Sequence, residues 1–351
     1  MIIEEGCEDY MEKLKSRDEA SRKVKAIGLL SGGLDSTLAA AVVKRAGIEV
    51  IGLYVKNTFV TDRRREEHLR RAVDQLGIPL RVIDRSDEHL DVVRHPRYGY
   101  GSGMNPCVDC RIFMLRTAKE VMEEERAQFV VTGEVLGQRP MSQHRRALLL
   151  IARESGLGDR LLRPLSANLL PETLPVREGW LDKDQLYSIS GRSRAPQRAL
   201  ADALGVTDYP QPAGGCLLTE KVYSARLRDA FSHLGADALD REGFELLRHG
   251  RHFRLGESVK AIIGRNEAEN EILSEFKPGR IALEPLGVMG PLALVEGDPT
   301  PEQLRLAAAL VARYCDRADQ VEFAVTRGDE TTRITVSPLT PDDPRIDAWR
   351  I

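Results

Sequence analysis

The sequence predicts an α/β fold: a doubly wound parallel sheet followed by a smaller α+β domain. Three observations support this. Short apolar segments alternate with helical patterns in the first third of the chain, as in parallel sheets with helices on both faces. The last hundred residues change to a mixed pattern that ends like a hairpin. The chain has 351 residues, 42% of them hydrophobic, which favours two cores.

The first domain is expected over residues 23–220, after an N-terminal arm at residues 1–22. Its strands are predicted at residues 25–30, 49–55, 80–83 and 129–132. Its helices are predicted at residues 37–46, 63–76, 111–126, 182–189 and 196–204. Sheets of this kind bind ligands at the carboxyl ends of their strands.

The second domain is expected over residues 250–351, after connecting helices within residues 221–249. Strands are predicted at residues 257–263, near Ile281 and near Leu292, with a hairpin formed by 321–326 and 332–336. Helices are predicted at residues 267–275 and 301–315, the latter with Pro301 in its first turn.

Composition excludes several classes of protein. The 51 basic and 54 acidic residues give a net charge of −3, which excludes a globally basic protein that coats nucleic acid. The longest purely apolar run, residues 306–312, is far shorter than the roughly 20 residues of a membrane helix. The first residues are acidic where a signal peptide is basic, so we expect a cytoplasmic protein and no membrane partner.

The five cysteines are an odd number in a large chain without an export signal. They are Cys7, Cys107, Cys110, Cys216 and Cys315. A disulfide framework is therefore disfavoured, and metal or thiol chemistry is favoured.

The most informative stretch follows the first strand and reads Ser31-Gly32-Gly33-Leu34-Asp35-Ser36. A glycine-rich turn between a strand and a helix gathers backbone N–H groups at the positive end of the helix dipole, which favours phosphate. Asp35 beside phosphate indicates a nearby metal ion or a role in orienting the reacting partner. The spacing matches neither the dinucleotide fingerprint nor the lysine-bearing nucleotide loop.

This hexamer resembles the pyrophosphate loop of the PP-loop ATP pyrophosphatase superfamily (adenine nucleotide alpha hydrolase-like). The resemblance implies cleavage of ATP between its α and β phosphates, with Mg²⁺, and transfer of AMP to a substrate oxygen. It also implies an ATP site, with Asp35 as a catalytic residue. The ATP-binding residues would be Leu30, Ser31, Gly32, Gly33, Leu34, Asp35, Ser36, Tyr54, Gly133, Glu134 and Gln138.

Further stretches are similar to the tRNA thiouridylase and 4-thiouridine synthetase-like branch of that superfamily. Residues 131–138 resemble the segment that follows the fourth strand in 4-thiouridine synthetases, and residues 105–110 resemble the Asn-Pro-Cys-x-x-Cys of thiouridylases. An Arg-Pro-Leu at residues 163–165 and Gly214-Gly215-Cys216 also fall where those families place such segments. The resemblance covers residues 25–218, without the N-terminal RNA-binding domain or the rhodanese-like extension of 4-thiouridine synthetases.

Cys107, Cys110 and Cys216 are predicted to be catalytic. Cys107 and Cys110 precede a predicted helix, whose dipole favours thiolate. Three interpretations remain open: a zinc site completed by His95 or His144, a persulfide relay, and a [4Fe–4S] cluster held by three cysteines. We favour the cluster, because a relay needs only two cysteines and the cluster-dependent tRNA thiolases have three. Cys7 and Cys315 are expected to have no role in this chemistry.

Residues 259–270 resemble the start of the NFACT RNA-binding domain, which also ends in an alanine-rich helix. Residues 246–351 carry 14 basic and 17 acidic residues, an unfavourable balance for phosphate binding. The alternative is a domain that packs on the catalytic unit or forms a homodimer. Arg139, Arg145, Arg146 and Arg265 are the candidate tRNA-binding residues, whereas the arginines at 63–65 and 70–71 are expected to form a solvated helix face.

Together these features predict an ATP-dependent tRNA sulfurtransferase that adenylates a uridine carbonyl and replaces its oxygen by sulfur. Its partners would be tRNA and a sulfur donor, either inorganic sulfide or a cysteine desulfurase. The alternatives are the same adenylation chemistry on a small molecule, with sulfur insertion or amide formation, and an RNA-binding protein with an inactive loop. The presence of Ser31, Asp35 and Ser36 disfavours the last alternative.

Overall fold

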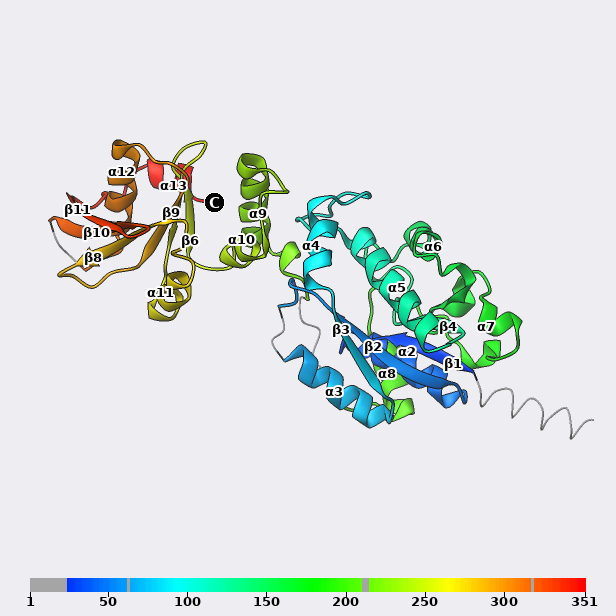
Figure 1. Ribbon diagram of the computed structural model, residues 1–351. Helices are drawn as coiled ribbons and strands as arrows, with labels where there is room; N and C mark the ends of the chain where they lie inside the picture. Colours follow the sequence, from blue (N-terminus) through cyan, green and yellow to red (C-terminus); the bar gives the residue numbers. More distant parts are fainter. Residues whose placement is uncertain (1–23, 62–63, 210–214, 317–318) are drawn as a thin grey trace, which may run out of the picture. The chain divides into compact units, whose positions relative to one another are not determined.

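The computed structural model describes residues 24–61, 64–209, 215–316 and 319–351. It divides into two compact units between Leu217 and Leu218 (Figure 1). The predicted N-terminal arm and Cys7 lie outside the described residues. The connecting helices predicted for residues 221–249 fall in the second unit.

The first unit is built on a five-stranded parallel sheet in the order β3-β2-β1-β4-β5. Its strands are β1 (Lys25–Leu29), β2 (Glu49–Lys56), β3 (Leu80–Asp84), β4 (Phe129–Thr132) and β5 (Leu161–Leu162). Its helices are α2 (Leu34–Arg45), α3 (Arg65–Leu76), α4 (Ser86–Arg94), α5 (Cys107–Glu124), α6 (Arg145–Glu154), α7 (Leu174–Arg177) and α8 (Ala195–Leu204). Short 3-10 turns occur at Gly158–Arg160, Ala167–Leu169, Lys183–Gln185 and Leu217–Thr219.

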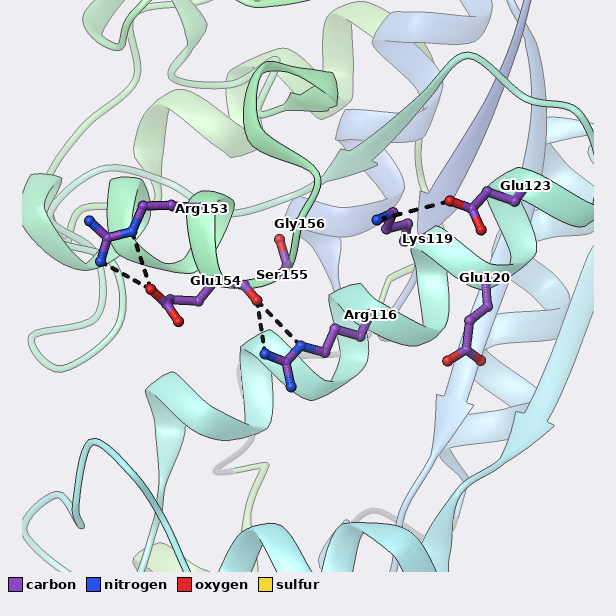
Figure 2. Close-up of a pocket in the computed structure, with 8 residues that line it drawn as sticks. All are labelled: Arg116, Lys119, Glu120, Glu123, Arg153, Glu154, Ser155 and Gly156. Carbon is purple, nitrogen blue, oxygen red and sulfur yellow. Dashed lines mark hydrogen bonds and ion pairs between the residues drawn. The ribbon is translucent and has the colours of Figure 1, made fainter.

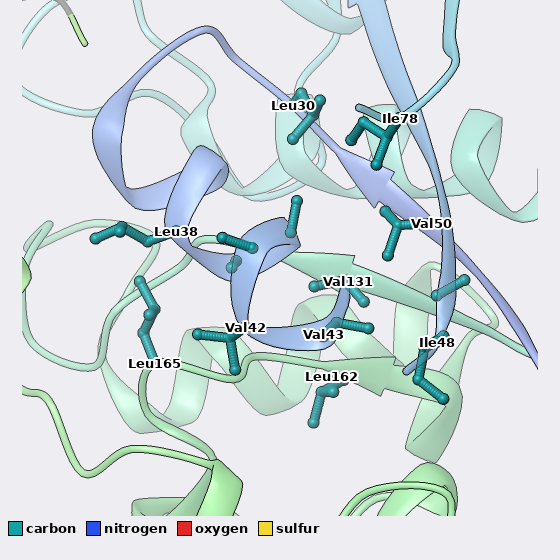
Figure 3. Close-up of a cluster of buried hydrophobic side chains, with 14 of the residues drawn as sticks. Leu30, Leu38, Val42, Val43, Ile48, Val50, Ile78, Val131, Leu162 and Leu165 are labelled. Carbon is teal, nitrogen blue, oxygen red and sulfur yellow. The ribbon is translucent and has the colours of Figure 1, made fainter. Parts of the chain in front are cut away.

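Apolar residues on both faces of this sheet bury two separate cores. One face packs against α2, α3 and α8 through residues such as Leu38, Leu69 and Leu200. Figure 3 shows part of this core, where Leu38 and Val42 of α2 lie near Val131 of β4. The other face packs against α5 and α6 through residues such as Leu115 and Ile151. Because β1, β2 and β4 are buried on both sides, they read as nearly continuous apolar runs, whereas the edge strand β3 is partly exposed. The predicted doubly wound α/β class is confirmed.

The second unit is a six-stranded antiparallel sheet in the order β11-β10-β8-β9-β7-β6. Its strands are β6 (Arg251–Arg254), β7 (Lys260–Ile263), β8 (Ile281–Leu286), β9 (Ala293–Glu296), β10 (Val321–Arg327) and β11 (Glu330–Val336). Its helices are α9 (Lys221–Leu234), α10 (Arg241–Leu246), α11 (Glu267–Ser274), α12 (Pro301–Ala312) and α13 (Arg345–Trp349). Alternate strand residues pack on α12 and α13 on one face and on α10 and α11 on the other.

Several elements differ from the sequence prediction. The structure adds α4, α6, α7, α13, β5 and β6, and it replaces the helix predicted at residues 182–189 by a single 3-10 turn. The helix predicted from Arg111 begins at Cys107 instead, since Cys110 N–H already donates to the Pro106 carbonyl at 2.8 Å. The two cysteines therefore lie in the first turn of α5 rather than before it.

None of the helices formed by the described residues combines the length and the apolar character that a membrane crossing requires.

Candidate functional site

The loop between β1 and α2 is closed by its own serines. Ser36 Oγ accepts a hydrogen bond from Ser31 N–H at 3.2 Å and donates to the Gly33 carbonyl at 2.9 Å. Gly32 has φ +70°, a conformation that favours glycine. These contacts shape the turn at the N-terminus of α2, where backbone N–H groups and the helix dipole favour an anion.

Gly133 brings the end of β4 against this helix start. A Cβ at Gly133 would lie 2.4 Å from the carbonyl carbon and oxygen of Asp35 and from the Ser36 nitrogen. No side chain fits at that separation, so only glycine permits this approach. The loop and the segment after β4 therefore form one surface at the carboxyl edge of the sheet.

Asp35 is held at one carboxylate oxygen and unpaired at the other. Gln138 Nε2 donates to Asp35 Oδ2 at 2.8 Å, and the Arg194 guanidinium lies 4.0 Å from the same oxygen. Asp35 Oδ1 is buried and has no hydrogen-bond partner among the described residues. A buried, unpaired carboxylate oxygen needs a partner, and a cation or a donor on a ligand could supply one.

Glu134 forms a buried ion-pair network next to Gly133. Its carboxylate lies 2.9 Å from Arg163 Nε and 3.3 Å from Arg111 Nε, and Thr132 Oγ1 donates to it at 3.2 Å. Burial raises the pKa of Glu134, but the charges of Arg163 and Arg111 outweigh that effect and hold it below its usual range. The predicted ATP-binding side chain is thus engaged within the protein and links β4 to α5.

Arginines surround the surface between the loop and α5. Desolvation lowers the pKa of Arg139, and the charges of Arg111 and Arg194 lower it further, while Cys107 and Asp35 act in the opposite direction. Arg65, one of the arginines predicted to form a solvated helix face, also donates from Nη1 to the Ser31 carbonyl at 2.7 Å, and Arg63 lies outside the described residues.

Cys107 is the first residue of α5 and is half-buried. Asn105 Nδ2 donates to its sulfur at 3.1 Å, and Asn105 Oδ1 accepts from Gly103 N–H at 3.0 Å. The asparagine thus connects the glycine-rich loop before α5 to the thiol. This gives the Asn-Pro-Cys motif a structural explanation.

Cys110 contacts a histidine that no sequence motif indicated. His89, on α4, is 2% exposed, and its Nε2 lies 3.1 Å from Cys110 Sγ. Desolvation raises the pKa of the Cys110 thiol to about 12, an effect that the positive charge of Arg111 opposes. Desolvation also lowers the pKa of His89 to about 4, so its imidazole is neutral at physiological pH.

Cys216 reaches the same edge of the sheet from a distant part of the chain. It forms an isolated antiparallel bridge with Val60, after the end of β2, and Leu217 N–H donates to the Phe59 carbonyl at 2.9 Å. The charges of Cys216 and Cys107 both raise the pKa of the Cys110 thiol, so the three cysteines interact electrostatically.

The donor set fits an iron–sulfur cluster in its chemistry, because thiolates are the usual ligands of such clusters and three cysteines lie at this edge of the sheet. No group of three cysteine, histidine or carboxylate side chains in the described ranges is already arranged to hold a metal ion. The two histidines considered as zinc ligands, His95 and His144, are exposed, and His144 Nδ1 accepts the Ala147 N–H as the cap of α6.

The remaining predicted residues have varied surroundings. Leu30, Leu34 and Tyr54 are buried in the core around α2. Arg146 is exposed, Arg145 donates to the Leu169 carbonyl at 2.6 Å, and Arg265 pairs with Glu269 in the second unit. Cys315 is half-buried, and desolvation raises the pKa of its thiol to about 11.

The sequence prediction missed His89 and Arg194 as members of this region. His89 lies in a short helix without a motif, and Arg194 lies in a polar turn before α8. The only signal in the sequence was the single histidine among the apolar positions of residues 86–94.

A pocket of about 550 Å³ lies elsewhere, between α5 and the end of α6 (Figure 2). Charged residues line it, with Arg116, Glu154 and Lys119 among them, and Arg116 donates to the Glu154 carbonyl at 3.0 Å. It contains none of the predicted site residues.

A strand, a Ser-Gly-Gly-Leu-Asp-Ser loop and a helix on a five-stranded parallel sheet give the first unit the architecture expected of a PP-loop domain. Residues 21–168 match the family described as thiamine biosynthesis protein (ThiI). Residues 250–350 match the NFACT protein RNA binding domain. These two matches confirm the resemblance predicted from the sequence, with the ThiI-like match in the first unit and the NFACT-like match in the second.

Curated relatives are similar over much of the chain. The tRNA-specific 2-thiouridylase MnmA of Azorhizobium caulinodans is 27% identical over 261 residues, which cover 68% of this chain and 63% of that protein. The same enzyme of Sulfurimonas denitrificans is 36% identical over 117 residues, covering 30% of this chain and 33% of the relative. The alignment with the Azorhizobium protein thus spans less than two thirds of that relative.

Two solved structures are also similar. A 4-thiouridine synthetase–RNA complex with bound ATP is 21% identical, with a TM-score of 0.35 and coverage of 52% of each chain. The U34-tRNA thiolase NcsA from Methanococcus maripaludis with its [4Fe–4S] cluster is 16% identical, with a TM-score of 0.34 and coverage of 69% of this chain and 81% of that one.

Proposed function

We propose that the protein is an ATP-dependent tRNA sulfurtransferase that converts a uridine carbonyl to a thiocarbonyl. One observation carries the proposal: the pyrophosphate-type loop and the three cysteines lie at the same carboxyl edge of one parallel sheet. The loop follows β1, Gly133 follows β4, and Cys216 pairs with Val60 after β2. A nucleotide-activating group and a sulfur-handling group are both needed for thiolation.

The loop would bind the departing pyrophosphate of ATP. Backbone N–H groups at the start of α2 and the hydroxyls of Ser31 and Ser36 would stabilise its charge, the general electrostatic route to catalysis. The unpaired Asp35 Oδ1 would receive Mg²⁺ that accompanies the phosphates. Arg139 and Arg194 would add positive charge on the open side of the loop.

The reaction has two balanced steps. The uridine carbonyl oxygen attacks the α-phosphorus, pyrophosphate leaves, and the ring nitrogen beside the carbonyl loses its proton. Hydrosulfide then adds to the activated carbon, the carbon–oxygen bond breaks, and AMP leaves with the oxygen. The hydrogen that hydrosulfide brings moves from the sulfur to the ring nitrogen and replaces the proton lost in the first step. The products are thiouridine, AMP and pyrophosphate.

Cys107, Cys110 and Cys216 would hold a [4Fe–4S] cluster on the substrate side of α5. Bound there, the cluster would supply an iron without a protein ligand, where incoming sulfur can bind. The donors would be inorganic sulfide or a cysteine desulfurase. A persulfide relay between two of the cysteines is the competing mechanism for the same reaction.

The tRNA would be bound by Arg139, Arg145 and Arg146 near the loop and by the NFACT-like unit. Arg145 and Arg146 begin α6, directly after the segment that carries Gln138 and Arg139. Arg265 would contribute less, since it forms an ion pair with Glu269.

The test is thiolation of unmodified tRNA by anaerobically purified protein with ATP, Mg²⁺ and sulfide, followed by mass spectrometry of the nucleosides. We expect one thiouridine, no product without ATP, and at least a hundredfold loss of pyrophosphate release in Asp35→Asn, as for an electrostatic catalytic group. Release of pyrophosphate with a small carbonyl or carboxylate acceptor and none with tRNA would contradict the proposal.

The cluster is tested separately by metal content. Purified protein should contain about four irons per chain, and Cys107→Ala, Cys110→Ala and Cys216→Ala should each lose them together with thiolation. Cys315→Ala is the matched control and should retain both. Full activity of iron-free protein with one dispensable cysteine would favour the relay.

A further inference from the structure

His89 is a buried polar side chain whose position is fixed from two directions. Its ring lies between Phe59, at a centroid distance of 5.7 Å, and Phe113, at 5.6 Å, with interplanar angles of 53° and 59°. Both neighbours belong to cysteine-bearing segments. Phe113 lies one helical turn after Cys110 on α5, and the Phe59 carbonyl accepts the Leu217 N–H next to Cys216.

The two ring nitrogens of His89 have different surroundings. His89 Nε2 lies 3.1 Å from Cys110 Sγ, whereas Nδ1 is buried and has no partner within the part of the chain that the structure describes. An orphaned buried N–H is rarer than an under-satisfied acceptor. The proton therefore belongs on Nε2, and that N–H points at the sulfur.

We propose that His89 is a positioning residue that fixes the Cys110 sulfur in the first turn of α5 through an Nε2–H···S hydrogen bond. The proposal deepens the proposed function, because it names the residue that orients one member of the sulfur-handling trio. Cys107 has a different donor, Asn105 Nδ2, so the two cysteines of the first turn are held independently. A hydrogen bond to a ligating sulfur also raises the reduction potential of an iron–sulfur centre.

The first experiment uses iron-free full-length protein without ATP or tRNA. Iodoacetamide labels the thiols at one fixed pH, and peptide mass spectrometry gives the alkylation rate of Cys110 relative to Cys107 in the same molecule. His89→Phe keeps an aromatic ring between Phe59 and Phe113 and removes the donor; His89→Gln returns an N–H near the same place. His233→Gln, on α9 of the second unit, is the control.

We expect His89→Phe to lower the Cys110 to Cys107 rate ratio about fivefold, as the loss of one hydrogen bond to the reacting sulfur predicts. His89→Gln should restore the ratio to within about twofold of wild type, and His233→Gln should leave it unchanged. If His89→Phe does not fold, His89→Leu removes the donor with a smaller side chain. An unchanged ratio in the folded donor-free variant, or no recovery in His89→Gln, overturns the proposal.

The second readout is the reduction potential of the iron-loaded protein, followed spectroscopically. It should fall in His89→Phe and recover in His89→Gln, while Asn105 and Cys107 remain intact. A potential that is equal in all three proteins would also overturn the proposal. If wild-type protein takes up no iron, the cluster hypothesis fails, and the alkylation ratio still decides the role of His89.

Discussion

At the scale of single residues, burial governs the ionisation of the side chains in this site. Glu134 is 2% exposed and is paired with Arg163, which is 5% exposed, so both charges depend on each other. Removing one partner of such a pair leaves an uncompensated buried charge. Cys110 and His89 show the same effect on their ionisation, since desolvation favours the neutral form of each.

Glu134 should therefore make the stability of the protein depend on pH. Its pKa is lower in the folded protein, so its contribution is present above the ordinary carboxyl pKa and is lost as pH falls through the lowered value. Glu134→Gln should remove this part of the acid dependence. At neutral pH it should also lower the free energy of unfolding by about 3 kcal/mol, because Arg163 loses its charge partner.

Urea denaturation between neutral and acidic pH measures both effects. Glu172→Gln is the control, since its partner Lys183 is exposed and solvent screening leaves such surface pairs little effect on stability. Equal losses in the two variants would show that the Glu134 network does not stabilise the fold.

At the scale of elements, the site depends on how closely β4 approaches the start of α2. The two meet at Gly133, where backbone contacts leave no room for a side chain. By contrast, Gly33 has φ −103°, and a Cβ there would meet only Ser31 Oγ at 3.6 Å. The structure therefore requires glycine at position 133, whereas position 33 has room for a Cβ.

Gly133→Ala should consequently displace β4 from α2 and lower the free energy of unfolding by about 1–3 kcal/mol, the usual effect of overpacking. Gly33→Ala should change it by only a few tenths of a kcal/mol. Chemical denaturation gives both values, and calorimetric titration with ATP should show weaker binding in Gly133→Ala. A Gly133→Ala protein as stable as wild type would contradict the close packing.

At the scale of the whole molecule, the two units have separate hydrophobic cores. The cores around α2 and α5 belong to the first unit, and those around α12 and α11 to the second. The proposed ATP site lies entirely in the first unit. Ligand binding stabilises only the structure that forms the site.

ATP with Mg²⁺ should accordingly raise the unfolding temperature of one transition in differential scanning calorimetry and leave the other in place. At a hundred times its dissociation constant, ATP would stabilise the first unit by about 2.7 kcal/mol. Ser36→Ala should reduce the shift, since Ser36 Oγ closes the loop. If ATP raised the unfolding temperature of every transition by the same amount, the two units would unfold together.

The sequence by itself determined the fold class, the nucleotide-type loop and the family resemblance. Alternating strand and helix patterns depend on local periodicity, and the hexamer at residues 31–36 is a contiguous motif. In the first unit, β1 to β4, α2, α3 and α8 lie close to where they were predicted, as does α12 in the second unit. The short elements β5, β6 and α4 were missed, because two to nine residues carry too little periodicity.

Only the tertiary structure decided which distant residues complete the site. His89 contacts Cys110, Gln138 contacts Asp35, and the Cys216 segment pairs with Val60. The paired residues are 21, 103 and 156 positions apart in the sequence, in that order. The physical reason is the parallel sheet: it brings the carboxyl ends of separate strands to one edge, while burial there fixes the protonation of the side chains that meet.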